Sequence, residues 1–218
     1  GSIIEAVTGE AVDAYITRAL FAPLKIVAAF HTGLLPQNAV VSDMYAMPSR
    51  ALASVVRETT APAAVPQPLS DYTLTAGKLT ISAPGLGRLV AALCDGGWFG
   101  DTRVLHESSI AQMLTAQNQL GSVHCDSGRG LCVNIVPDAI VPGRTLYGHG
   151  GKANGMLCAA YFDPTDRTGV VMLTNGCNNR ATYQYVGKLT VRALQLCYTD
   201  WLNATHVAED PWLVEGTP

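Results

Sequence analysis

The stretch Leu146–Gly176, LYGHGGKANGMLCAAYFDPTDRTGVVMLTNG, carries the clearest structural pattern of the 218-residue chain. Its apolar runs predict three strands, at about residues 144–148, 156–162 and 169–174. The segment 163–169 is rich in turn-forming residues, so it should join two antiparallel strands. The His-Gly-Gly-Lys step at 149–152 packs poorly, because glycine weakens a strand and often marks the close approach of a ligand or another backbone. The stretch therefore predicts an antiparallel sheet in which one strand has a ligand-binding edge.

Helices are predicted before and after this sheet. Apolar residues at helical spacing indicate helices at about 3–20, 84–95, 106–116 and 179–198, the first interrupted at Gly9. Ser108 is the expected N-cap of the third helix, and Leu189 is expected on the buried face of the last. Residues 72–82 should be extended, and residues 31–70 have the weak periodicity of loops. This order predicts an α+β fold, an antiparallel sheet flanked by helices.

The character of the chain changes near residue 125. Residues 1–125 should form a mostly helical part with a loop-rich excursion at about 30–70. Residues 126–218 should form the antiparallel sheet and the C-terminal helix. We expect the two parts to make one structural unit, because a chain of this length is compatible with a single domain.

The composition argues against several classes of function. Apolar residues make up 48% of the chain, enough for a sizeable core, and no run of 18 or more of them predicts a membrane span. The net charge of −3, without a stripe of Lys and Arg, argues against a nucleic-acid partner. No Cys/His cluster has metal-ligand spacing, so we expect neither a metal nor a cofactor.

The cysteines leave the redox compartment, and with it the localisation, undecided. None of the six forms a C-x-x-C pair. Cys125 and Cys132 flank a glycine-containing turn and can form a disulfide, or they stay free thiols if the chain resides in a reducing cytosol. Both alternatives stand on the sequence alone.

Four segments together resemble the C-terminal part of the serine β-lactamase and penicillin-binding-protein superfamily, in the branch of class C β-lactamases, DD-peptidases and related esterases. The segments are Ser2–Leu24, Ala76–Gln117, Tyr147–Gly155 and Phe162–Gly176. In the third of them, His-Gly-Gly stands where the superfamily has its Lys-Thr-Gly motif. The resemblance implies a partial β-lactamase/transpeptidase-like fold, without the N-terminal strands and the helix of the nucleophile. It also implies acyl-enzyme chemistry on a β-lactam, a D-amino-acid peptide or an ester.

The resemblance also implies roles for five residues of the chain. The Lys152 backbone N–H would be one donor of the oxyanion hole, and His149 would replace the usual lysine and hydrogen-bond the base or the substrate carboxylate. Gly150 and Gly151 would let the substrate lie along the strand, because no Cβ intrudes. Asn175 follows a strand where the family often has a polar residue near the pocket, although a strand-capping role is an equal alternative. A histidine at 149 favours peptidase or esterase relatives over efficient β-lactamases.

Two motifs that this resemblance requires are missing from the sequence. No serine has a lysine three positions later, and no tyrosine has an asparagine two positions later. The chain would thus begin just after the tyrosine motif, as a C-terminal portion that is inactive alone. Two alternatives are a non-catalytic pseudoenzyme that binds ligands or acts as a scaffold, and a truncated product without activity. In each case the 169–174 strand would have an exposed edge, which the missing N-terminal part or a second copy would cover.

Overall fold

The computed structural model describes residues 1–47, 50–53, 74–117, 128–138, 140–153, 155–177, 182–183 and 186–201. The helices are α1 (Ser2–Thr8), α2 (Val12–Ile16), α3 (Leu74–Gly77), α4 (Ala83–Cys94), α5 (Glu107–Leu114) and α6 (Lys188–Gln195). Wider π-helical turns at Thr17–Phe21 and Leu196–Trp201 extend α2 and α6, and a 3-10 turn occupies Thr32–Leu34.

The strands fall into one long sheet and several short pairs. The long sheet contains β7 (Gly128–Arg129), β8 (Asn134–Pro137), β9 (Thr145–Ala153), β10 (Met156–Asp163) and β11 (Thr168–Thr174). The short pairs are β1 (Ala28–Ala29) with β4 (Thr80–Ile81), β2 (Met44–Met47) with β3 (Arg50–Ala53), β5 (Trp98–Phe99) with β6 (Thr102–Arg103), and β12 (Thr182–Tyr183) with β13 (Val186–Gly187).

The long sheet is antiparallel, with the strand order β11-β10-β9-β8-β7. This confirms the predicted strands and the predicted antiparallel turn between β10 and β11. β10 pairs with β9 on one side and β11 on the other, so Cys158 lies opposite both Gly151 and Leu173. Within the described residues, β11 pairs with β10 alone and forms one edge of the sheet.

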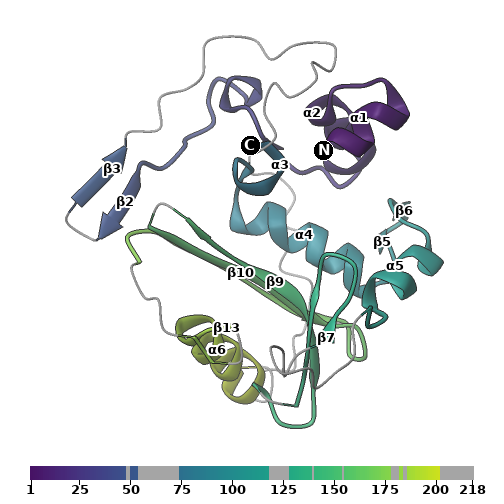
Figure 1. Ribbon diagram of the computed structural model, residues 1–218, viewed down its shortest axis with the longest axis vertical. Coiled ribbons are helices and arrows are strands. Elements are labelled where there is room, and N and C mark those ends of the chain that lie inside the picture. The colour runs from purple at the N-terminus through teal and green to yellow at the C-terminus, as the bar shows by residue number, and fades with distance from the viewer. Residues whose placement is uncertain are drawn as a thin grey trace.

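Helices cover both faces of this sheet (Figure 1). Tyr161 and Phe162 are successive residues of β10, so their side chains point to opposite faces. Tyr161 belongs to a core cluster with Leu194 of α6, and Phe162 belongs to a cluster with Val90 of α4. Tyr161 and Phe162 are only 1% and 2% exposed, so each helix seals its face. The resulting layers of helix, sheet and helix confirm the predicted α+β class.

The N-terminal part has its own apolar cluster, which α4 also joins. Phe21, Leu24, Ile26 and Phe30 pack there together with Ala92 of α4. The buried carboxylate of Asp13 accepts the backbone N–H of Phe30 at 3.0 Å and so fixes the chain that leaves α2. α4 thus contacts the N-terminal cluster with one side and the sheet with the other.

Several helix ends lie where the sequence predicts them. Pro84 stands in the first turn of α4, where its missing N–H costs no hydrogen bond, and the Ser82 hydroxyl caps that turn by accepting the Gly85 N–H at 3.1 Å. α1 ends at Gly9, whose φ of 71° is the left-handed conformation that glycine adopts without strain.

Two local predictions are wrong and one is incomplete. The N-cap of α5 is His106, and Ser108 lies inside the first turn instead. Residues 74–77 form α3, although the sequence predicted an extended stretch from 72 to 82. The predicted loop at 31–70 contains the β2–β3 hairpin, whose register shifts twice. These bulges break the alternation of side chains, which explains why the sequence pattern did not reveal the hairpin.

Leu189 is also predicted on the wrong side of α6. It is 37% exposed, whereas Val191, Leu194 and Tyr198 are buried against the sheet. The helix begins at Lys188, not near 179, so its inward face is set by the later residues. The predicted division near residue 125 lies outside the described residues, and so does Cys125, one member of the cysteine pair that can form a disulfide. The division and the disulfide therefore both stay predictions.

Candidate functional site

The strand β9 has two halves with different neighbours. From Thr145 to Gly148 it pairs with β8, and Tyr147 and Gly148 also pair with β10 on the other side. From His149 to Ala153 it pairs with β10, while β8 pairs with no residue beyond Gly148. The second half, which we call the outer half of β9, therefore presents an edge that no described strand occupies.

Burial changes at the same point. In the first half, the buried residues Leu146 and Gly148 alternate with the half-buried residues Thr145 and Tyr147, as expected for a strand that alternates between two covered faces. All five residues of the outer half are exposed. The His-Gly-Gly-Lys step predicted from the sequence therefore lies entirely in the exposed part of the strand.

The glycines of β9 differ in whether their positions have room for a Cβ. Gly148 has a φ of +156°, and a Cβ there would lie 2.1 Å from the carbonyl oxygen of Ala160. A Cβ on Gly150 or Gly151 would meet its nearest atom only at 3.6 or 3.8 Å, which is ordinary contact. Gly148 is therefore required by the fold, whereas packing among the described residues does not require Gly150 and Gly151.

The register divides the outer half between the two faces of the sheet. Side chains at 149 and 151 share a face with Ala160 and Cys158, their partners in β10, because residues opposite each other in a pair point the same way. That is the face covered by α4, since Ala160 packs against the cluster of Val90. Lys152 alternates with position 151 and so faces the α6 side.

The His149 ring contacts the backbone of its own strand. Its Nδ1 lies 2.6 Å from the carbonyl oxygen of Gly150. A carbonyl oxygen only accepts hydrogen bonds, so Nδ1 carries the proton in this contact, an assignment made from the hydrogen-bond partner. In the neutral ring Nε2 is then the acceptor, which is the polarity needed to receive a proton or a hydrogen bond from a substrate.

The sequence also predicted roles for Lys152 and Asn175. Lys152 is exposed and lies opposite Leu157 in β10; the proposed role of its N–H stays a prediction. The Asn175 amide is engaged within the chain: its Oδ1 accepts the Tyr45 N–H at 2.9 Å, and its Nδ2 donates to the Asp43 carbonyl at 2.6 Å. These contacts give Asn175 a definite structural function, while its contact with a substrate remains untested.

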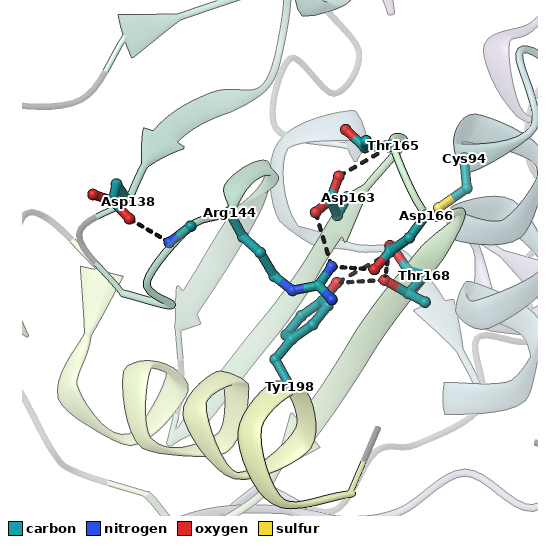
Figure 2. Close-up of polar contacts among 9 residues, drawn as sticks. Cys94, Asp138, Arg144, Asp163, Thr165, Asp166, Thr168 and Tyr198 are labelled. Carbon is teal, nitrogen blue, oxygen red and sulfur yellow. Dashed lines mark hydrogen bonds and ion pairs between the residues drawn. The ribbon is translucent and has the colours of Figure 1, made fainter. Parts of the chain in front are cut away.

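A polar network occupies the opposite end of the sheet, where β9 begins (Figure 2). Arg144 forms an ion pair with the buried Asp163, at 3.0 Å, and a second one with Asp166. Its guanidinium also lies over the Tyr198 ring, 4.9 Å from the centroid. Burial raises the pKa of Tyr198 to about 12, so its hydroxyl stays protonated and donates to the Thr168 carbonyl at 3.3 Å.

A cavity of about 630 Å³ opens beside this network, lined by Arg144, Asp163, Asp166 and Tyr198 among others. The charged groups in it are paired with one another rather than presented to a ligand. We therefore interpret the network as a clamp that ties the C-terminal helix to β9 and the β10–β11 turn. Sequence analysis missed it, because its members are spread from residue 144 to residue 198.

Among the residues that the structure describes, no cluster of three or more His, Cys, Asp or Glu side chains is arranged to hold a metal ion. No helix in the same residues has the length and apolar character needed to cross a bilayer.

The fold of this chain is similar to that of several solved structures. A D-stereospecific amidohydrolase from Streptomyces sp. is 21% identical, with a TM-score of 0.60 over 91% of this chain and 52% of its own. A penicillin-binding protein from Bacillus halodurans is 17% identical, with a TM-score of 0.56 over 89% and 53%. A class C β-lactamase is 15% identical, with a TM-score of 0.55 over 82% and 49%. This chain thus spans about half the length of these structures.

A family model described as beta-lactamase matches residues 1–192 of the chain. Because this match covers well over half of the sequence, the chain belongs to the β-lactamase family. The membership confirms the resemblance seen in the four sequence segments, and the half-length coverage agrees with the predicted partial fold. A comparison with curated protein sequences gave no match.

Proposed function

We propose that this chain supplies one wall of an acyl-transfer site, in a serine hydrolase that acts on a β-lactam, a D-amino-acid peptide or an ester. The outer half of β9 is that wall. The family to which the chain belongs supports a hydrolase of this kind. The titles of the similar structures name an amidohydrolase, a penicillin-binding protein and a β-lactamase, which fit the same chemistry.

The observation that carries the proposal is the contrast among the glycines of β9. Gly148 is required by a backbone contact inside the sheet, but Gly150 and Gly151 have room for a Cβ. Glycine in a strand weakens it, so its presence where the fold does not need it favours a role toward a ligand. A substrate backbone that lay along this edge would come closest at the positions that lack a Cβ.

Two groups would then act on the substrate. The Lys152 N–H would stabilise the oxyanion that forms when the carbonyl is attacked, and losing one such donor raises the barrier by about 3 to 4 kcal/mol. The Nε2 of His149 would accept a hydrogen bond from the substrate or from the group that shuttles the proton, since Nδ1 is directed to Gly150.

The rest of the catalytic machinery would come from elsewhere. The sequence has no Ser-x-x-K and no Tyr-x-Asn, so no residue here takes the place of the nucleophile, its lysine or the tyrosine base. A further polypeptide segment or a second chain would supply them. Their absence from the sequence is also what favours the alternative function, a non-catalytic binding or scaffold protein with the same ligand edge.

The β11 edge fits a partner that completes the sheet. Its sequence, TGVVMLT, has neither a charge nor a proline, the two features by which natural proteins blunt an exposed edge. Val170 packs against the core cluster on the α6 face of the sheet, and Val171 packs against the cluster on the α4 face. The backbone N–H and C=O groups on the outer side of β11 are then left to pair with another strand. We propose that a missing part of the fold or a second copy covers this edge.

Gly151→Leu tests the ligand edge. We would titrate the 15N-labelled protein with millimolar ampicillin and with N-acetyl-D-alanyl-D-alanine and follow the backbone amides. At least one ligand should shift the resonances of 149–153, and Gly151→Leu should abolish these shifts, because its side chain covers the edge. Gly77→Leu is the matched control, since Gly77 also has open space around it and lies in α3.

The same samples decide the chemistry of the chain alone. Intact-mass analysis after incubation with ampicillin should show no covalent adduct, because the nucleophile is absent. An adduct on a serine of this chain would contradict that part of the proposal. Shifts that avoid 149–153, or that persist in Gly151→Leu, would show that β9 is not the ligand edge.

A further inference from the structure

Asn175 joins two parts of the chain that are 130 residues apart in sequence. Its single carboxamide accepts the N–H of Tyr45 and donates to the carbonyl of Asp43. These two backbone groups are separated by one residue in an extended segment, so they point to the same side. One side chain therefore pairs with the segment as a residue of a neighbouring strand would.

The anchor of this tether is itself fixed to the site strands. Thr174 donates from its Oγ1 to the Leu157 carbonyl at 2.8 Å, and the Cys177 N–H donates to the Gly155 carbonyl at 2.8 Å. Leu157 lies opposite Lys152, and Gly155 belongs to the turn that joins β9 to β10. The segment after β11 is therefore held against the end of the sheet where the outer half of β9 lies.

We propose that Asn175 is a positioning residue, which holds β2 beside the outer half of β9 as the second wall of the ligand site. This inference rests on the proposed function of β9. β2 contacts β10, and the β2–β3 hairpin lies beside the tip formed by β9 and β10 (Figure 1).

The second wall also indicates a class of substrate. Asp43, just before β2, is exposed, but Met44 and Tyr45, the first residues of β2, are half-buried and present apolar and aromatic side chains. Aromatic groups pair favourably with aromatic and thioether side chains. A substrate with an aromatic group next to its scissile carbonyl would gain from this wall, whereas a substrate that lacks the group would contact β9 alone.

Two ligands that differ in this group provide the test. Ampicillin carries an aromatic side chain, and 6-aminopenicillanic acid is the same bicyclic core without it. The dissociation constant of each would be measured from the amide shifts of 149–153. In Asn175→Ala the affinity for ampicillin should fall about 5-fold or more, as expected for an indirect coupling. The affinity for 6-aminopenicillanic acid should stay unchanged.

Hydrogen exchange provides an independent readout of the tether. The Tyr45 amide should exchange faster in Asn175→Ala, because it loses its acceptor. Asn175→Asp should restore this protection only in part, because it keeps the acceptor for Tyr45 but loses the donor to the Asp43 carbonyl. Asn38→Ala is the matched control, since Asn38 is exposed in a nearby turn. It should change neither the Tyr45 exchange nor the ampicillin affinity.

The outcomes separate this inference from the proposed function. An equal loss of affinity for both ligands, or no loss for either, would overturn the positioning role while leaving β9 as a ligand edge. If the unmodified protein binds neither ligand at 149–153, the proposed function fails, and the second wall fails with it.

Discussion

The two halves of β9 belong to one strand and keep one register with β10, yet they meet different surroundings. The first half pairs with β8 along its whole length, and its glycine is packed against the backbone of Ala160. The outer half has β10 on one side, exposed residues throughout and glycines with room around them. The same residue type therefore serves the fold at Gly148 and leaves the edge open at Gly150 and Gly151.

The largest expected effect on stability comes from a substitution in the first half of β9. Gly148→Ala should lower the free energy of unfolding by about 3 kcal/mol, because the new Cβ would overlap the Ala160 carbonyl oxygen. Urea unfolding followed by circular dichroism measures this change. Gly150→Ala is the matched control and should change stability by less than about 1 kcal/mol, since only the intrinsic preference of the backbone changes. Equal effects at both positions would remove the distinction between the halves.

The next effect concerns the clamp at the beginning of β9. Arg144→Ala should lower the free energy of unfolding by about 2 kcal/mol, because it leaves the buried Asp163 without its cation; partial exposure of Arg144 moderates the loss. Arg18→Ala is the control: Arg18 pairs with Glu10 at the surface, where solvent screens the pair, so its removal should change stability far less. Similar losses in both variants would show that the ion pairs of Arg144 contribute no more to stability than the exposed pair of Arg18.

The clamp also has a pH dependence with a defined sign. Burial alone would raise the pKa of Asp166, but hydrogen bonds from Thr168 and Arg144 and the charge of Arg144 outweigh burial and lower it. Its stabilising contribution is therefore complete above the unfolded value of about 3.9 and is lost as the pH falls through the lower native value. Urea midpoints measured from pH 5 to pH 2 should fall less steeply in Arg144→Ala than in the unmodified protein.

The smallest effect on stability concerns a second open edge, β11. Unlike the outer half of β9, this edge is apolar and carries no charge. Leu173→Lys should reduce self-association of the chain in sedimentation velocity and change stability by about 1 kcal/mol or less, because lysine discourages pairing at an edge. Leu189→Lys, at a partly exposed position of α6, is the matched control.

This last experiment also distinguishes the β11 edge from the outer half of β9. If copies associate through β11, Leu173→Lys disrupts them and Gly151→Leu does not. If the copies associate through the outer half of β9, Gly151→Leu disrupts them and Leu173→Lys does not. In that case the outer half of β9 is an interface between copies rather than a ligand edge. An unmodified protein that stays monomeric at high concentration would contradict the proposal that a second copy covers β11.

The sequence predicted best where its signal was local. The strands β9, β10 and β11 followed from apolar runs bounded by turn residues, and α4 followed from Pro84 and the glycines after it. The position of the His-Gly-Gly-Lys step on an exposed strand edge was predictable for the same reason, since glycine weakens a strand and often marks the close approach of a ligand or another backbone.

Other features required tertiary information. The β2–β3 hairpin is bulged, so it lacks an alternating pattern, and the role of Ser108 as a cap depended on where α5 begins. The tether of Asn175 joins residues 130 positions apart, and nothing near Asn175 in the sequence indicates the partner. The distinction between Gly148 and its neighbours depends on how closely β10 approaches, which a run of glycines does not reveal.

The backbone requirement at Gly148 has a consequence for sequence divergence. Any descendant of this chain that keeps the β9–β10 pair must keep glycine at 148, whatever its activity becomes. Positions 150 and 151 have no such restriction, so they are free to drift once the ligand no longer demands an open edge. Among related sequences, glycine at 148 should therefore be present wherever the fold is kept. Glycine at 150 and 151 should be present only where the ligand is still bound.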